Sequence, residues 1–427
     1  MPLHNNLAPD RMRLLGGQWL VVGVLLCVTV NLLLMDGVKQ TLGRQRQQEH
    51  GPAEEAGGDP ALIGCPWLSP GDGRDQRPDP GRLRIATFNA EWLFDGVDDP
   101  SHVPWPDPAA AQTHLVRVAE EVAALDADVL NLVEVEGCFM LQRLLAALPL
   151  AQRERLTPFV IKGSDSATRQ QAGLVSTLAP TGPLRRTEGR ATWPIPGSAC
   201  GYRGEGGKST GVSKHWWGVW SVPGLSAELL IVGAHLKARP TEPRSCAQRE
   251  AQASVLAELV RQEGFEAGRH VVLMGDLNDF DEEVPDAEGN TPTSAVLRML
   301  SSELGLHRYS PVPSTPGFGP WHPPSRPTAV CPRWSALCSG SNTPSWLHRC
   351  RCFADSVAER LSVGDRFTWE GERYPRAALD HILLSEGLLP LIESVEVEGR
   401  GASDHRALLV ELRLKDDAEP GSGRPEL

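Results

Sequence analysis

The sequence predicts an α/β fold in which two packed sheets carry helices on their outer faces, preceded by one transmembrane helix. Three observations support this prediction. Strand-like and helix-like segments take turns from residue 83 onward, the strands are joined both by hairpins and by helical crossovers, and an uncharged apolar stretch lies near the N-terminus. Such a mixture of connections is typical of two sheets packed together and covered by helices.

Composition places the chain among ordinary globular proteins. Of its 427 residues, 41% are hydrophobic and 22% are charged, which excludes wholesale disorder. The formal net charge of −12 argues against a protein that coats nucleic acid through bulk electrostatics. It does not exclude a nuclease that relies on a few local Arg or Lys side chains.

Residues 14–35 form the apolar stretch, which is long enough, at about 1.5 Å per helical residue, to cross a bilayer. A cleaved signal peptide is the alternative, but the stretch is too long for one and no small-x-small cleavage pattern follows it. We therefore expect a short N-terminal tail at residues 1–13 and a transmembrane signal anchor at residues 14–35. Basic residues flank the anchor on both sides and leave its orientation open.

Eight cysteines follow the predicted anchor, and an even number on one side of a membrane fits an oxidising compartment. Sequence cannot choose among the roughly one hundred pairings that eight cysteines allow. Cysteines near residues 331–352 could instead suggest zinc, but no Cys-x-x-Cys spacing is present. We expect disulfides, and a single-pass membrane protein whose large C-terminal domain is extracytoplasmic.

The organisation beyond the anchor follows from composition. Residues 36–81 are rich in Gly, Pro, Gln, Glu and Asp and predict a flexible stalk. One ordered domain is expected over residues 82–415, with a disordered tail at residues 416–427. Inside the domain, the Pro-rich segment 310–364 contains four cysteines and predicts a disulfide-held insertion, because long structureless stretches are uncommon in compact domains.

Elements within the domain are predicted from the period of their apolar residues. The segment 83–88 is a strand-like run, and 114–125 has apolar residues at helical spacing. The remaining segments follow the same two patterns. Strands are expected at 128–133, 173–178, 216–220, 228–234, 271–274, 382–384 and 407–412, and helices at 139–148, 247–262 and 294–304.

Polar side chains follow these apolar strands at the points where the strands end. Taken singly, such residues are more often turn, cap or solvated loop residues. Taken together they favour one site, because parallel or mixed sheets gather strand ends along one edge. Carboxylates that bind a hard cation beside an imidazole suit hydrolysis of phosphate esters. The residues are Asn89, Glu134, His235, Asp276, Asn278, Asp380, Asp404 and His405.

In this order the motifs resemble those of the endonuclease/exonuclease/phosphatase superfamily. That superfamily includes DNase I-like nucleases, abasic-site nucleases, sphingomyelinases and inositol-polyphosphate 5-phosphatases. The resemblance runs from about residue 83 to residue 414 and is most specific at Gly275-Asp276-Leu277-Asn278 and Ser403-Asp404-His405. Segments such as Gly233-Ala234-His235-Leu236-Lys237 are similar to bacterial-type secreted or membrane-linked nuclease-like members.

The resemblance implies a four-layer αββα sandwich and a divalent-metal-dependent phosphodiesterase. It implies that Asn89, Glu134 and Asp404 bind the metal, which would be Mg²⁺, with Mn²⁺ or Ca²⁺ as alternatives. Gln170 and Lys237 are expected to contact substrate. The sequence departs from the family around Gln170, where relatives often carry Gly-Gln-Asp and this chain has Arg and Gln as neighbours.

The resemblance also assigns proton transfers to two histidines. His405, oriented by Asp380, would take a proton from the attacking water, and His235 would protonate the leaving oxygen. Asp276 and Asn278 would position the water or the phosphate oxygens. An imidazole suits both transfers because its unperturbed pKa is about 6.5.

Three functions remain open at this point. The first is an extracytoplasmic nuclease that hydrolyses DNA or RNA, with nucleic acid as partner and the membrane reached through the anchor. The second is a phospholipid or inositol-phosphate hydrolase, and the third is a catalytically inactive surface interaction module. Basic side chains could contact phosphates or be solvated surface charges: Arg185, Arg186, Lys237, Arg239, Arg244 and Arg249.

Overall fold

The structure is a computed structural model that describes residues 65, 74–97, 99–101, 103–281, 285–301, 306–309, 364, 366–371 and 375–414. All of them belong to one compact unit of the chain, residues 59–427. The predicted N-terminal tail, the anchor at 14–35, most of the stalk, nearly all of the insertion at 310–364 and the tail at 416–427 lie outside these residues. Among the described helices, none is long and apolar enough to span a bilayer.

The first sheet has six strands in the order β12–β13–β1–β2–β4–β3. Its central pair, β1 and β2, is parallel, and its other neighbouring strands are antiparallel. The strands are β1 (Arg82–Leu93), β2 (Val129–Val135), β3 (Thr157–Val160), β4 (Gln171–Ser176), β12 (Ile392–Glu398) and β13 (Ala407–Arg413).

The second sheet has five strands in the order β10–β11–β9–β8–β7, with β8 and β9 parallel. A separate two-stranded sheet is formed by β5 and β6. The strands are β5 (Ala191–Trp193), β6 (Lys208–Thr210), β7 (Lys214–Trp220), β8 (Leu229–His235), β9 (His270–Asp276), β10 (Leu306–Tyr309) and β11 (Asp380–Ser385).

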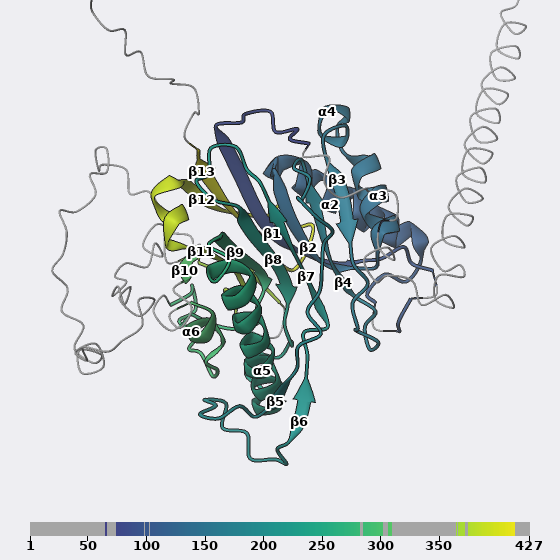
Figure 1. The fold of residues 1–427 in the computed structure, drawn as a ribbon. Coiled ribbons are helices and arrows are strands. Elements are labelled where there is room, and N and C mark those ends of the chain that lie inside the picture. The colour runs from purple at the N-terminus through teal and green to yellow at the C-terminus, as the bar shows by residue number, and fades with distance from the viewer. Residues whose placement is uncertain are drawn as a thin grey trace, which may run out of the picture. The chain divides into compact units, whose positions relative to one another are not determined.

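Helices cover the outer faces of both sheets (Figure 1). Two of them, α2 and α3, pack beside strands of the first sheet, and α5 covers the second. The elements are α2 (Pro108–Leu125), α3 (Cys138–Ala147), α4 (Leu150–Arg153), α5 (Pro243–Val260), the π-helical turn η2 (Arg261–Phe265), α6 (Val296–Leu300) and the 3₁₀ turn η6 (Glu386–Leu391). The predicted arrangement of helices outside two packed sheets is therefore confirmed.

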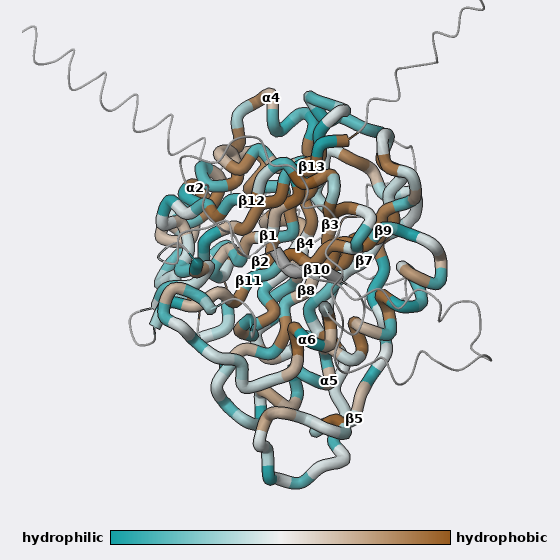
Figure 2. The backbone as a smooth tube through the Cα atoms, turned by 90° about the vertical axis from the view of Figure 1, so that its left-hand side faces the viewer, coloured by the Kyte–Doolittle hydropathy of each residue, from teal (hydrophilic) through white to brown (hydrophobic). Residues whose placement is uncertain are grey.

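Period-two alternation explains why the layers stack. In β9, Val272 and Met274 belong to the core between the two sheets, whereas Val271 and Leu273 pack with residues of α5. Figure 2 shows the apolar residues concentrated along the central strands. Each large apolar side chain buried in this way contributes about 2 kcal/mol.

One polar link crosses the core between the sheets. The indole Nε1 of Trp216 on β7 donates to Asn131 Oδ1 on β2 at 3.0 Å, and Asn131 Nδ2 donates to Thr87 Oγ1 at 2.9 Å. Gly233 leaves room for this link, because a Cβ there would lie 2.3 Å from Asn131 Oδ1. Since an unpaired buried amide costs about 1–3 kcal/mol, the link favours one alignment of the two sheets.

Two boundaries differ from the sequence prediction. Residues 74–81 were expected in the stalk, but Arg77 is buried, pairs with Asp75 at 2.7 Å, and donates to the carbonyl of Arg82 at 2.8 Å. The predicted helix at 294–304 is shorter among the described residues, where α6 covers Val296–Leu300. The prediction of disulfides is confirmed for Cys65–Cys138 and Cys200–Cys246, and the remaining four cysteines beyond the predicted anchor lie outside the described residues.

Candidate active site

Strands of both sheets place polar side chains at one edge of the sandwich. In the first sheet, Asn89 of β1 pairs with the residue that precedes Glu134 of β2. In the second sheet, Asp276 of β9 lies opposite His235 of the parallel strand β8 and opposite Asp380 of the antiparallel strand β11. The register thus brings His235, Asp276 and Asp380 into one row across three strands, as expected from their positions at strand ends.

Gly275 allows two of these strands to approach closely. Its φ is +144°, and a Cβ at this position would lie 1.8 Å from the carbonyl oxygen of Ala234, its partner on β8. No other residue could replace it without shifting the backbone next to Asp276. This requirement explains the glycine in the Gly-Asp-x-Asn motif.

Asn89 is the centre of the buried hydrogen-bond network. Its Nδ2 lies 3.1 Å from Asp276 Oδ2 and 3.3 Å from both Glu134 Oε1 and His405 Nε2. Its Oδ1 accepts the backbone N–H of Glu91 at 3.1 Å. An amide has only two N–H donors, and the carboxylates of Asp276 and Glu134 can accept both of them. The network thus brings residues that are far apart in the sequence together in one pocket.

His405 is held by Asp380. Its Nδ1 donates to Asp380 Oδ2 at 2.7 Å, and its Nε2 lies 4.0 Å from Asp276 Oδ2. Burial opposes protonation of the ring, but the carboxylates of Asp380, Asp276 and Asp404 outweigh burial and raise the pKa of His405 to about 10. His405 is therefore an imidazolium at neutral pH in the metal-free protein.

His235 has the opposite environment. Its Nε2 lies 3.4 Å from the Nζ of Lys214 and 3.5 Å from Asp276 Oδ2. Burial, followed by the positive charges of Lys214 and His405, lowers the pKa of His235 well below its ordinary value. Nε2 thus faces both the donor Lys214 and the acceptor Asp276, and the other ring nitrogen is Nδ1. That Nδ1 is buried and has no hydrogen-bond partner among the described residues.

Three acids gather on the first-sheet side of the pocket. Glu134 accepts the backbone N–H of Trp92 at 3.2 Å, and Glu91 accepts the backbone N–H of Asp404 at 3.0 Å. Burial, followed by the negative charges of Asp404 and Glu134, raises the pKa of Glu91 to about 7. Burial likewise raises the pKa of Glu134. Crowded carboxylates of this kind are the oxygen ligands that hard divalent cations prefer.

Backbone strain is concentrated at the same edge. Glu91, Trp92, Glu134 and Asn278 have φ values of 45°, 56°, 63° and 52°. Each left-handed conformation of a non-glycine residue costs about 1–3 kcal/mol and persists only where its surroundings enforce it. Such clustering is typical of functional sites.

The other predicted site residues occupy more peripheral positions. Asn278 donates its backbone N–H to Asp276 Oδ1 at 3.0 Å and its side-chain amide to the Leu236 carbonyl at 3.4 Å. Asp404 is exposed, and its Oδ2 accepts the indole N–H of Trp369 at 2.9 Å. Gln170 is buried, and Lys237 is exposed just beyond β8.

The prediction that Arg249 contacts phosphates or is a solvated surface charge is wrong. Arg249 is fully buried, and its guanidinium donates to the carbonyls of Lys237 at 3.0 Å and Pro240 at 2.9 Å. Asp279 lies 4.0 Å away and balances part of its charge. Arg249 therefore stabilises the loop after β8 and cannot reach a substrate, whereas Arg239 in that loop is 76% exposed.

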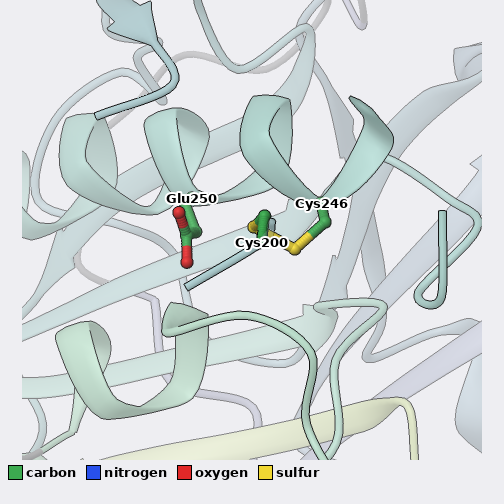
Figure 3. Close-up of side chains that lie close together, drawn as sticks. All are labelled: Cys200, Cys246 and Glu250. Atoms are coloured by element: carbon green, nitrogen blue, oxygen red, sulfur yellow. A yellow bond between two sulfur atoms is a disulfide. The ribbon is translucent and has the colours of Figure 1, made fainter. Parts of the chain in front are cut away.

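Three groups of potential metal-ligating residues occur among the described residues, and one of them, Asp95, Asp99 and Glu136, lies outside the pocket residues named above. Ligand atoms of Asp276, Asp380 and His405 lie within 4.8 Å of one another in the pocket. Cys200, Cys246 and Glu250 form another group (Figure 3), but the two sulfurs are joined in a disulfide and cannot act as thiolate ligands.

The sequence prediction missed two residues of the pocket, Glu91 and Lys214. Lys214 begins β7, and its Nζ donates to Gln170 Oε1 at 2.9 Å in addition to its contact with His235. Asn89 directly follows the predicted strand 83–88, whereas Glu91 lies three residues beyond it, so the rule that found Asn89 did not reach Glu91; both lie within the longer β1. Only the two-residue spacing from Asn89 could have drawn attention to Glu91.

Comparison with known protein families identifies the family of the chain. Residues 86–405 match the Endonuclease/Exonuclease/phosphatase family. The chain belongs to this family. The comparison with curated proteins finds no match.

Solved structures with similarity to the chain include the human Nocturnin catalytic domain with bound sulfate, at 16% identity and a TM-score of 0.43, covering 81% of this chain and 97% of that one. TDP2 from C. elegans is 15% identical with a TM-score of 0.39, covering 78% and 75%. A family protein from Beutenbergia cavernae is 19% identical with a TM-score of 0.39, covering 78% and 72%.

Proposed function

We propose that the chain is a divalent-metal-dependent phosphodiesterase that hydrolyses DNA or RNA. The observation that supports this proposal most strongly is the buried network in which Asn89 lies within hydrogen-bond distance of Asp276, Glu134 and His405. Both histidines and all of the acids expected from the family motifs are present in or beside that network. An interaction module without activity would have no need to keep them there.

The acidic side of the pocket fits a divalent cation. Glu134, Asn89 and Asp404 would hold the ion, and Glu91 beside them is a further oxygen donor. Burial is the main cause of the raised pKa values of Glu91 and Glu134, and the negative charge of Asp404 adds to it at both groups. When bound, the ion supplies positive charge that stabilises the phosphoryl oxygens during hydrolysis.

The proposed proton transfers require a change in charge at both histidines. To accept a proton from water, His405 must lose the one that Asp380 and Asp276 stabilise, and positive charge near Glu134 and Asp404 favours that loss. To protonate the leaving oxygen, His235 must gain a proton, which a bound phosphate favours. The pocket thus becomes competent only when both ion and phosphodiester are present, while Asp276 and Asn278 position the reacting oxygens.

Substrate choice and location are also part of the proposal. The exposed side chains of Lys237 and Arg239 lie just after His235 in the chain and can contact flanking phosphates. The two disulfides of the described domain support an extracytoplasmic location, since such bonds persist in oxidising compartments. The predicted anchor at residues 14–35 would tether the enzyme to a membrane.

The experiment that tests this function is a substrate panel with the full-length protein. Plasmid DNA, RNA, sphingomyelin and phosphoinositides are incubated with Mg²⁺, Mn²⁺ or Ca²⁺, or with EDTA. We expect divalent-ion-dependent cleavage of nucleic acid, and its loss in Asp276→Ala. If only the lipids or inositol phosphates are hydrolysed, the substrate is a phospholipid or an inositol phosphate and not nucleic acid. If none of these substrates is hydrolysed with any ion, the catalytically inactive interaction module is favoured.

A further inference from the structure

A two-stranded arm extends beyond the end of the second sheet (Figure 1). It consists of β5, β6 and the loop between them, and residues 190–210 are here named the basic arm. β5 and β6 pair through Ala191–Thr210, Thr192–Ser209 and Trp193–Lys208. β6 ends four residues before Lys214, so the arm leads directly into the candidate active site.

The basic arm is fixed to α5 by covalent and apolar contacts. The disulfide Cys200–Cys246 joins the arm's loop to the first turn of α5. Trp193 is buried beside this disulfide, with the Tyr202 ring 5.4 Å away and the Arg244 guanidinium 5.9 Å from its ring centre. The arm therefore has its own small core and does not depend on a ligand for its conformation.

Buried polar side chains of α5 fix the base of the arm relative to the site. Gln252 donates to the Gly211 carbonyl at 3.3 Å and accepts the backbone N–H of Lys237 at 2.8 Å. Glu250 accepts the backbone N–H of Ala199 at 3.1 Å. Because Lys237 follows His235 by two residues, these contacts hold the arm in a defined position beside the pocket.

The surface so formed is positively charged in a negatively charged protein. Arm residues 190–210 contain three basic residues and one acid, and the loop 237–244 contains three more basic residues and one acid, a net charge of +4 in a chain of −12. All six basic side chains are exposed: Arg190, Arg203, Lys208, Lys237, Arg239 and Arg244. Such a local excess attracts polyanions despite the overall charge.

We propose that the basic arm binds the phosphodiester backbone of a polynucleotide strand whose scissile phosphate lies in the candidate active site. This inference rests on the proposed function and extends it to phosphates away from the reaction centre. Three paired residues span about 10 Å. Phosphates on one strand of a duplex are spaced by about 3.4 Å along its axis, so the arm can follow about three of them.

The composition of the arm favours nucleic acid over a lipid surface. Peripheral membrane contacts need apolar side chains that enter the bilayer as well as positive charge. Among the described residues, the exposed large hydrophobic side chains are Val97, Val116 and Leu150, none of which is in the arm. The aromatic residues of the arm face its own core.

The test compares two charge-matched double variants of the full-length protein. R203Q/K208Q removes two arm charges that take part in no ion pair among the described residues. R117Q/R153Q removes two exposed charges on α2 and α4 and is the control. Binding of a fluorescent 30-nucleotide DNA is measured in EDTA at several salt concentrations, and kcat/KM is measured for that DNA and for bis-p-nitrophenyl phosphate.

We expect R203Q/K208Q to weaken DNA binding about tenfold and to reduce the salt slope by about 1.4, that is, by about 0.7 for each phosphate of a single strand that the variant no longer neutralises. The small diester should be hydrolysed at the wild-type rate, and the control should behave as wild type. An unchanged salt slope, or an equal loss in the control, would overturn the proposal. If the wild type binds DNA through the arm but hydrolyses nothing, the proposed function fails while the arm's role survives.

Discussion

The two histidines of the candidate active site share one pocket but differ in charge. His405 is paired with Asp380 at 2.7 Å and has a pKa raised to about 10. His235 lies 3.4 Å from the Lys214 ammonium group, and its pKa is lowered. Both rings are buried, so burial alone cannot explain the difference.

The charge of each imidazole therefore follows from its nearest charged neighbour and not from the sheet to which the histidine belongs. Asp276 lies within 4.0 Å of both rings and cannot distinguish them. Asp380 on one side and Lys214 on the other provide the distinction. Separated charges in one pocket are the usual basis for assigning one group as acid and another as base.

The largest effect on activity is expected when the imidazole of His405 is removed. His405→Ala should lower kcat/KM for nucleic acid about 10³-fold, because it removes the proton acceptor for the attacking water. Steady-state hydrolysis in Mg²⁺ measures the loss. His270→Gln, at the far end of β9, is the control. An activity within tenfold of wild type in His405→Ala would exclude His405 as the base.

Removal of the other histidine should have a smaller effect that depends on the substrate. His235→Asn should lower kcat/KM about 10²-fold for DNA, since an alkoxide leaving group needs a proton. With bis-p-nitrophenyl phosphate the loss should be less than about fivefold, because p-nitrophenolate leaves without protonation. Equal losses for both substrates would indicate that His235 has a binding role and does not act as an acid.

The charge difference itself can be altered through Lys214. Lys214→Met removes a positive charge close to His235 Nε2 and should raise the pKa of His235, leaving that of His405 nearly unchanged. Histidine ring signals followed by NMR during a pH titration measure both values. A pKa of His235 that stays the same would show that burial by itself depresses it.

The smallest expected effect concerns Glu91. Its folded-state pKa of about 7 exceeds the ordinary 4.5, so its contribution to stability is lost as pH rises through about 7. Glu91→Gln should therefore stabilise the metal-free protein at pH 8 by about 1 kcal/mol, after allowing for solvent screening, and have no effect below pH 4.5. Denaturant unfolding in EDTA measures this, and destabilisation at pH 8 would contradict it.

Much of the fold could be predicted from sequence because the central strands are long apolar runs that end in polar residues. β3, β5, β6 and β10 were missed, since runs of three or four residues are too short to show alternation. β12 was missed as well, because this seven-residue edge strand is only half-buried and lacks the apolar run of the central strands. The basic arm built from two of them was therefore not foreseen.

The site was predictable to the extent that its residues lie at strand ends. Glu134, His235, Asp276, Asp380 and His405 lie at or next to strand ends, and Asn89 follows the predicted strand 83–88 although β1 continues to Leu93. These six residues come together. Lys214 does not stand out, because a lysine at the start of a strand is usually solvated, and its contact with His235 depends on the antiparallel register of β7 and β8. The charge states of the histidines likewise depend on neighbours that only the tertiary structure supplies.

The most direct test of this account is the titration of His235 and His405 in the full-length wild-type protein, followed by NMR first in EDTA and then in Mg²⁺. The account predicts that, without metal, His405 stays protonated well above pH 7 while His235 stays neutral well below pH 6.5, and that Mg²⁺ lowers the pKa of His405. The account would be contradicted if both histidines titrated near pH 6.5 and Mg²⁺ left their pKa values unchanged, since such histidines could not share one pocket with Asp380 and Lys214.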